Sequence, residues 1–578
     1  MTELSTPAQK TDLNSDGLER GVGFIGLLWA SETSIIGSGW LFGALGAATI
    51  AGPSAILGWV LGSIIILTLA LVHAELAGLF PVSGGTSRFP HYAFGSFAGA
   101  TFGWASYLQA ATVAPIEVLA AIQYLSTAHW ARNFFHFTAA AGGAGGTLHG
   151  VGYLAAAIML AFFVVVNIVG IRMFARINNA ITSWKVLIPI ITIFVLLIGH
   201  FHGSNFGHAG GGFFVHGSAV KSILLTLPAG IIFSLLGFEQ AVQLGGEAKN
   251  PERDLARAVI LSMLIGGVVY ILIQLAFLGA MPTNVLRANG GWTGLATSTS
   301  AVSNQLHAGP FFTLASIAGI SWLATVLRID AVVSPGGTGL MYETSSARLS
   351  FGLSRNGFLP PAFERVNRER VPVFGVIVAT LVGVLFLLPF PSWAKLVNIV
   401  TSASVFMYAG APVSLGALRK QKPDLPRTYR LPAAHILSPA AFAGAGLVIL
   451  FTGWQNVSTL IVALLLGYLL IWVSYATNAN PKAPRMDWQS APWIISWIIG
   501  MALIDYFSDF GAGGIIGGIG FFKNVLSHGG NYDLGLYGSI GASIGFSLII
   551  YFWAVASRLP PAKVDEYVAD VYPPPVAE

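Results

Sequence analysis

The sequence has 578 residues, of which 54% are hydrophobic and only 9% charged, and it contains no cysteine. Soluble domains average roughly 45–50% apolar and about 25% charged residues. The composition therefore excludes an ordinary soluble protein and indicates an all-α integral membrane protein. Without cysteine, neither a disulfide framework nor a thiolate metal site can form.

The polar N-terminal stretch MTELSTPAQKTDLNSDGLER lacks the basic region and apolar core of a cleaved signal peptide. The first apolar segment is therefore expected to remain as a spanning helix. A spanning helix needs about 20 mostly apolar residues. Fourteen windows meet this requirement, at about 22–47, 54–79, 97–126, 150–170, 180–199, 222–245, 258–281, 319–347, 373–390, 393–417, 436–454, 458–476, 491–507 and 535–557.

Lysine and arginine alternate strongly between the two sides of these windows. If the N-terminus is cytoplasmic, 22 of the 29 basic residues fall in cytoplasmic segments. By the positive-inside rule, both termini are expected in the cytoplasm. The net charge of +5 is then a signal of topology, and nucleic-acid binding is not expected.

The first window carries the stretch SIIGSGW (Ser34–Trp40) at its centre, where two glycines weaken a helix. Non-helical backbone survives in a membrane only where it is buried in protein or lines a cavity. The exposed N–H groups of Gly37, Ser38 and Gly39 would suit a carboxylate, and the carbonyl of Ile35 would suit an ammonium. The alternative is a close helix-packing patch of small residues.

A second candidate break, IFSLLGFEQ (Ile232–Gln240), lies in the sixth window after Pro228 and Gly230. Here the carbonyls of Phe233, Ser234 and Leu236 would face an ammonium group. Paired interruptions at corresponding positions of two halves indicate a transporter binding site. Residues 21–199 and 221–417 each contain five of the predicted windows. Because five is an odd number of crossings, the second half enters the membrane from the opposite side, and the two halves are expected to form inverted repeats. The rest divides into a cytoplasmic tail (1–20), two helices (436–476), two extra helices (491–557) and a second cytoplasmic tail (558–578), whose end VYPPPVAE is expected to be disordered.

Several motifs carry a family resemblance. They are IIGSGWLFG, HAELAGLFPVSGGTSRF, VNIVGIRMFARINNAITSWKVLIPI, LLGFEQAVQLGGEAKNPERDLARAVI, SRNGFLPPAFERVNRERVPVFGV and APVSLGALRKQKPDLPRTYRLP. The chain resembles the amino acid, polyamine and organocation transporter superfamily, and most closely its bacterial aspartate-proton symporter subgroup. The resemblance implies a LeuT-type core of five plus five inverted helices, with helices 1 and 6 broken, within about fourteen helices. One departure is that Ser83, Gly84 and Gly85 are followed by Thr86, Ser87 and Arg88, where the family usually has an aromatic residue.

Ionisable residues inside a membrane are functional candidates because they are costly to insert. By resemblance, Lys185 is expected to anchor window one to window eight through its ammonium, and to carry a proton. The alternative is a lysine that extends to the inner interface.

Asp330, Ser334 and Thr338 recur every four residues and so share one face of window eight. Asp330 is a candidate for the coupling proton or for a structural ion pair. Arg328 could bind an acidic substrate side chain or pair with Glu117.

The resemblance assigns a pH-sensing role to Glu239 and an aromatic gate to Phe233. Glu117 is a weaker candidate for proton coupling, and Glu75 is expected to close the cytoplasmic gate. The alternatives are structural acids and core packing. His73 and the stretch FHGSNFGHAGGGFFVHG have irregular spacing, so no metal site is expected.

No phosphate-binding loop or nucleophile elbow is present, so neither ATP-driven pumping nor enzymatic catalysis is expected. The expected function is proton-coupled import of an amino acid, acidic amino acids first, by alternating access in the bacterial inner membrane. The expected partners are that substrate and the lipid bilayer, and the expected coupling ion is the proton, without a cofactor. Amino acid exchange, sodium coupling and a non-transporting amino acid sensor are the alternatives, and a channel is the least favoured.

Overall fold

The computed structural model describes residues 20–135, 137–138, 146–169, 171–215, 219–368, 370–389, 391–510, 534–569 and 571–572. The expectations for the N-terminal tail (1–19) and for residues 573–578 of the C-terminal tail lie outside the described residues. The first half contains α1 (Phe24–Ile35), α2 (Ser38–Ala51), η1 (Gly52–Ser54), α3 (Ala55–Leu79), α4 (Gly85–Phe94), α5 (Ser96–Leu125), α6 (His129–Phe135), β1 (Phe137–Thr138), β2 (Thr147–Leu148), α7 (Val151–Val169), α8 (Ile171–Gly199), η2 (Gly203–Phe206) and η3 (His208–Gly210).

The second half continues with α9 (Ala219–Thr226), a wide turn η4 (Leu227–Ile231), α10 (Ile232–Ser234), α11 (Glu239–Gln243), η5 (Gly245–Glu247), α12 (Pro251–Ala280), α13 (Thr283–Ala288), α14 (Gly291–Thr297), α15 (Ala301–Ala308), α16 (Pro310–Ile317), α17 (Ser321–Arg355), η6 (Pro361–Glu364), α18 (Val373–Leu387) and α19 (Trp393–Gln421). The remainder comprises α20 (Ala434–Thr452), α21 (Trp454–Ala476), η7 (Trp488–Ser490), α22 (Pro492–Tyr506), α24 (Gly535–Ala556) and α25 (Pro561–Val568).

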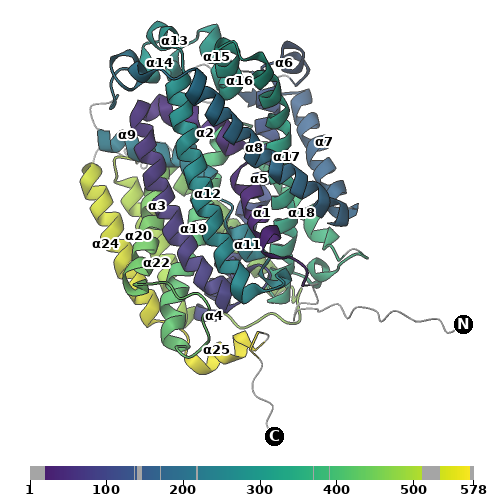
Figure 1. Ribbon diagram of the computed structural model, residues 1–578. Helices are drawn as coiled ribbons and strands as arrows, with labels where there is room; N and C mark the ends of the chain where they lie inside the picture. Colours follow the sequence, from purple (N-terminus) through teal and green to yellow (C-terminus); the bar gives the residue numbers. More distant parts are fainter. Residues whose placement is uncertain are drawn as a thin grey trace, which may run out of the picture.

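The long helices run side by side as one upright bundle (Figure 1). Nine helices of the described chain are long and apolar enough to cross a membrane. The broken or shorter helices α1, α9–α11, α18 and α22 lie among them, as does the long but more polar helix α17. The two short strands form only a hairpin, in which Phe137 pairs with Leu148. The protein is therefore an all-α, multi-pass membrane protein.

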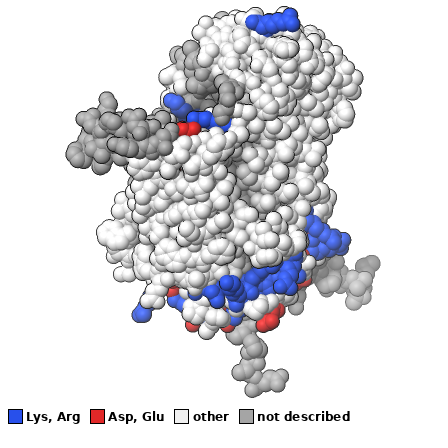
Figure 2. Space-filling view, turned by 90° about the vertical axis from the view of Figure 1, so that its left-hand side faces the viewer, with Lys and Arg blue, Asp and Glu red and all other residues white. Residues whose placement is uncertain are grey.

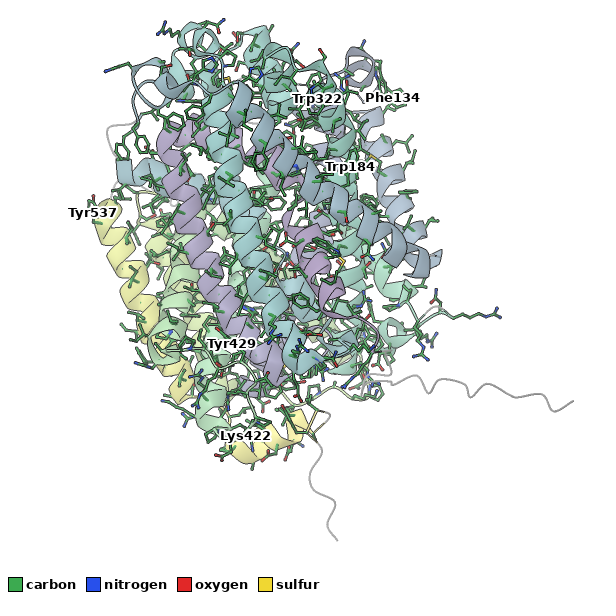
Figure 3. The ribbon with its side chains drawn as sticks, viewed as in Figure 1. Phe134, Trp184, Trp322, Lys422, Tyr429 and Tyr537 are labelled. Atoms are coloured by element: carbon green, nitrogen blue, oxygen red, sulfur yellow. The ribbon has the colours of Figure 1, made fainter. Side chains whose placement is uncertain are left out.

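Charge is distributed along the bundle as a membrane would require. Figure 2 shows a broad middle belt almost without charged side chains, above a band of lysine and arginine at the lower end. We call this lower end the basic end; α12 begins there and α17, α19 and α24 end there. Aromatic side chains mark both rims, with the exposed Trp322 and Phe134 towards the upper end and the partly buried Tyr429 towards the basic end (Figure 3).

The first predicted break is a local loss of helical geometry. Helix α1 ends at Ile35, α2 starts at Ser38, and Gly37 between them has φ −110° and ψ −142°. The second break spans two glycines in the left-handed region, Gly230 at φ 132° and Gly237 at φ 131°. Only glycine adopts such angles at little cost. Both helices therefore expose backbone groups inside the bundle.

Neighbouring helices enclose the two breaks, which therefore lie inside the bundle. Helix α5 is buried over its apolar window and packs between α17 and α19. Helix α12 packs along α3, and α1 contacts α8, α12 and α17. This enclosure supplies the protein environment that unpaired backbone groups need within a membrane.

The helices that follow α19 form a layer at the side of the bundle, which we call the side layer. Helix α20 packs on α19 and α24, and α22 packs on α24. After α24 the chain turns under the basic end, where α25 contacts α4. The C-terminal segment is thus partly structured: the hydroxyl of Tyr572, inside the stretch expected to be disordered, donates a hydrogen bond to the carbonyl of Leu79 at 2.6 Å.

Candidate functional site

A small cavity lies where the two breaks meet. It is lined by residues of α1, α2, α5, the second break and α17, namely Ser34, Ile35, Gly37, Gly39, Val113, Glu117, Phe233, Ser234, Leu236, Thr338 and Tyr342. This set contains Ile35, Gly37, Gly39, Phe233, Ser234 and Leu236, six of the residues predicted to bind substrate.

The cavity is closed in this conformation. Its volume is about 10 Å³, which is the space that a single water molecule needs. An amino acid is far larger than one water molecule. Substrate entry therefore requires the helices around the two breaks to move apart.

The start of α2 already holds a carboxylate. The backbone N–H of Ser38 donates to Oε2 of Glu117 at 2.8 Å, and the Ser38 hydroxyl donates to Oε1 at 3.0 Å. The indole N–H of Trp393 donates to the same hydroxyl oxygen at 2.8 Å. The helix N-terminus predicted to suit a substrate carboxylate is thus occupied by the side chain of Glu117.

Other backbone groups of the breaks are also engaged. The carbonyl of Ile35, predicted to face an ammonium group, accepts a hydrogen bond from the hydroxyl of Tyr270 at 2.6 Å. The amide of Leu236 donates to the carbonyl of Phe233 at 3.2 Å. A Cβ atom on Gly39 would lie 2.8 Å from Cα of Ser234, so the two breaks touch backbone to backbone.

Lys185 is fully buried in α8 and does not reach the membrane interface. Its ammonium donates to the carbonyl of Thr33 at 2.5 Å and to the hydroxyl oxygen of Thr338 at 2.6 Å. The Thr338 hydroxyl itself donates to the carbonyl of Thr33 at 2.8 Å. Lys185 therefore joins α1, just before its break, to α17, and Thr338 also lines the cavity.

Asp330 lies higher on the same face of α17. Its Oδ1 accepts hydrogen bonds from the Ser334 hydroxyl at 2.8 Å and from the indole of Trp184 on α8 at 2.9 Å; Trp184 is labelled in Figure 3. Asp330 forms no ion pair among the described residues. Asp330 and Thr338 both contact α8, and Ser334 between them bonds to Asp330, so the three share one face of α17 as their spacing predicts.

Arg328 lies outside the cavity. It precedes Thr338 by ten residues, which corresponds to about 15 Å along a helix. Its guanidinium carbon stacks 4.2 Å from the ring centre of Phe312, and it makes no ion pair with Glu117. In this conformation Arg328 is therefore placed on the outer side of the cavity, where it cannot contact a ligand held at the breaks.

Glu239 is the centre of a hydrogen-bond network at the end of the second break. Its carboxylate accepts from the hydroxyls of Tyr342 at 2.9 Å and Tyr408 at 2.5 Å, and from the backbone N–H of Gly237 at 2.8 Å. Gln109 of α5 donates to it at 3.3 Å. Four elements therefore converge on this one buried carboxylate.

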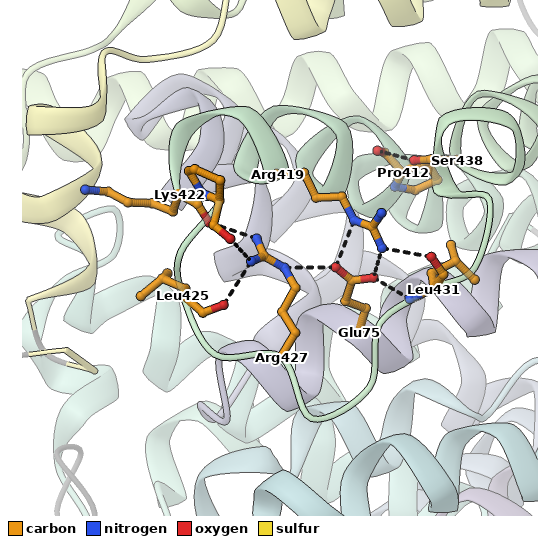
Figure 4. A network of polar contacts seen from close by, with 9 residues as sticks. Glu75, Pro412, Arg419, Lys422, Leu425, Arg427, Leu431 and Ser438 are labelled. Carbon is orange, nitrogen blue, oxygen red and sulfur yellow. Dashed lines mark hydrogen bonds and ion pairs between the residues drawn. The ribbon is translucent and has the colours of Figure 1, made fainter.

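Glu75 lies on α3 at the basic end and contacts α19 and the connection from α19 to α20 (Figure 4). Its oxygens accept from Arg419 at 3.0 and 2.5 Å, from Arg427 at 3.1 Å and from the backbone N–H of Leu431 at 2.7 Å. The Glu75 side chain is fully buried. This position and its partners fit the role predicted for a gate.

The sequence did not single out several polar residues of the site. Tyr270, Tyr342, Tyr408, Gln109 and Trp393 all donate to groups at the two breaks. Their only sequence signal is a polar atom within an apolar window. His73 makes a hydrogen bond to its own helix at Leu69, and no cluster of three histidine or acidic side chains in the described part of the chain is placed to hold a metal ion.

Comparisons with known proteins agree with this architecture. The amino acid permease family model matches residues 22–502. The glutamate/serine transporter AimA of Bacillus subtilis is 33% identical over 93% of this chain and 94% of its own length. The aspartate-proton symporter of the same organism is 32% identical over 95% of this chain and 98% of its own length. The branched-chain amino acid permease BcaP of Bacillus subtilis is 27% identical over 79% of this chain and 93% of its own length. The chain therefore belongs to the amino acid permease family and is a membrane transporter of amino acids.

Proposed function

We propose that this transporter imports an amino acid together with protons, and that acidic amino acids are its substrates. The observation that carries the proposal is the position of Lys185, a buried ammonium that joins the first broken helix to α17 beside the cavity. It has no carboxylate within ion-pair distance among the described residues, so its hydrogen bonds to Thr33 and Thr338 hold it. Proton transfer at this nitrogen would change the strength of the link between α1 and α17.

The physical reason is the strength of charged hydrogen bonds. A bond from an ammonium to a neutral oxygen is about twice as strong as one from a neutral amine. Protonated Lys185 therefore favours the conformation in which Thr33 and Thr338 lie together. Loss of the proton weakens this link and allows α1 to separate from α17, which is the movement that substrate release requires.

Glu117 supplies a second coupling step. The carboxylate of an incoming amino acid would compete with Glu117 for the N–H and hydroxyl of Ser38. A displaced carboxylate is costly to keep charged and unpaired in a buried site. Uptake of a proton by Glu117 would offset this cost and couple substrate binding to proton binding.

Two observations support acidic amino acids as the substrates: the names of similar proteins and the positive charge of Lys185 near the cavity. One similar protein is named for glutamate and serine, and another for aspartate. The ammonium of Lys185 lies one hydrogen bond from the cavity, through Thr338, and favours an anionic ligand nearby. The basic end is proposed to face the cytoplasm, with both termini on that side, by the positive-inside rule.

The test is uptake into proteoliposomes that contain the purified protein and no other transporter. Labelled aspartate, glutamate, serine and leucine are offered with and without an inward proton gradient. We expect gradient-dependent accumulation of an acidic amino acid by the unmodified protein. Lys185→Ala should abolish this accumulation, and Glu117→Gln should weaken its dependence on pH.

Lys395→Ala is the matched control, because Lys395 is an exposed lysine at the opposite end of the bundle. Uptake that ignores the proton gradient but rises with internal amino acid would identify an exchanger and refute the proposal. Uptake that requires sodium without a pH gradient would refute proton coupling as well.

A further inference from the structure

A second and much larger cavity lies away from the broken helices, between α19, α20 and α24. Its volume is about 300 Å³. It lies at the basic end, next to the last turn of α19 and the first turn of α20. None of its lining residues lines the cavity at the two breaks, so the two cavities are separate sites.

Its lining has two different parts. Arg419, Lys420 and His435 supply basic groups, and no acidic side chain lines the cavity. Leu415, Phe552 and Val555 supply an apolar wall. The Phe552 side chain is 61% exposed, so this wall continues onto the outer surface of α24.

Arg419 has a hydrogen-bonding group to spare. Its Nε and Nη2 donate to Glu75, and Nη2 also donates to the carbonyl of Leu431. Its Nη1 has no partner among the described residues, and Figure 4 shows this nitrogen directed away from Glu75, towards the side of Ser438. Ser438 also lines the cavity. Lys420 and His435 are exposed and have no hydrogen-bond partner among the described residues.

We propose that this cavity binds an anionic glycerophospholipid of the adjacent leaflet, with the phosphate at Arg419, Lys420 and His435 and the acyl chains along Phe552 and Val555. Basic pockets between spanning helices on the cytoplasmic side are the sites that anionic lipid head groups fill. The side of the molecule that carries α24 also shows the band of lysine and arginine at its lower end (Figure 2). The apolar wall selects a lipid over free phosphate.

The shared use of Arg419 gives the lipid a consequence for transport. A phosphate at Nη1 pulls the guanidinium towards the cavity, while Glu75 holds it towards α3. Arg427 keeps Glu75 paired in either case. An anionic lipid would therefore weaken one of the two arginine contacts that close the basic end, and so favour its opening.

The test measures lipid retention by native mass spectrometry on detergent-purified full-length protein. Phosphatidylglycerol, phosphatidylcholine and inorganic phosphate are added separately to the unmodified protein, Lys420→Ala, His435→Glu and the control Lys395→Ala. We expect selective retention of phosphatidylglycerol, reduced about fivefold by Lys420→Ala, reduced further by His435→Glu and unchanged by Lys395→Ala.

Equal retention of phosphatidylcholine, or no loss in either cavity variant, would overturn the proposal. Binding of inorganic phosphate that blocks retention of phosphatidylglycerol would show a phosphate site rather than a lipid site. Because both substitutions are of exposed residues, the variants should fold, and an unchanged melting temperature checks this. Lipid retention is measured without transport, so its failure leaves the proposed function untouched.

Discussion

Replacing Glu75 with glutamine should open the basic end of the transporter. Glu75 is fully buried and accepts hydrogen bonds from two arginines and one backbone amide. The neutral amide leaves Arg427, which is only 5% exposed, without its countercharge. Removing one partner of a buried ion pair costs about 3–5 kcal/mol. If the network forms only while the basic end is closed, a loss of about 3 kcal/mol changes the ratio of closed to open forms about 150-fold.

The absence of cysteine from the chain provides a clean assay. Ala241 on α11 is fully buried between the cavity and the basic end, and Ala241→Cys introduces a single thiol there. Its rate of modification by a water-soluble maleimide follows the population of the open form. We expect Glu75→Gln to accelerate modification about 100-fold. Glu364→Gln, which removes weaker and more exposed ion pairs at the same end, should change it less than twofold.

A modification rate that Glu75→Gln leaves unchanged, in protein whose melting temperature shows it to be folded, would refute the reasoning. It would mean that the Glu75 network persists when the basic end opens. An equal acceleration by Glu364→Gln would mean that any lost charge at this end loosens the bundle.

Two further predictions concern the approach of the breaks and the C-terminal helix. Gly39→Ala should abolish uptake, because the new Cβ would lie 2.4 Å from the hydroxyl oxygen and 2.8 Å from Cα of Ser234; Gly545→Ala, where a Cβ meets nothing within 4 Å, should leave uptake unchanged, and normal uptake by Gly39→Ala would refute the argument. Burial alone would raise the pKa of Asp487, but hydrogen bonds from Lys563, Tyr567 and the Ser96 amide hold it below its ordinary value of 3.8. A lowered carboxyl pKa contributes stability that is complete above the ordinary value and is lost as the pH falls through the folded value. Hydrogen exchange should therefore show α25 protected at pH 7 and released progressively as the pH falls below 3.8. Asp487→Asn should expose α25 already at pH 7, and protection that is unchanged by both the low pH and the substitution would contradict this account.

The sequence predicted the two breaks because glycine in a membrane helix has a large local cost, and local costs are visible in one chain. Gly37, Gly230 and Gly237 are the residues at which helical geometry is lost. The spacing of Asp330 and Thr338 also predicted their common face, since helix periodicity is local.

Apart from the Lys185 link, which was expected only from the family resemblance, contacts between distant residues could not be predicted. The hydrogen bond from the Ser38 amide to Glu117 joins positions 79 residues apart, and the one from Tyr408 to Glu239 joins positions 169 residues apart. Nothing near Tyr408 in the chain distinguishes it from a packing residue. The position of Arg328 shows the same limit, because charge within a window does not say whether a side chain lies beside the cavity or a few turns above it.

Two hydrogen bonds join residues that follow α24 to the ends of α3 and α4. The amide of Leu559 donates to the carbonyl of Ala93, and Tyr572 reaches the carbonyl of Leu79. During synthesis, the ends of α3 and α4 are made long before these partners leave the ribosome. These contacts can therefore form only after most of the chain has been made, and truncation before Leu559 would remove both of them from the basic end.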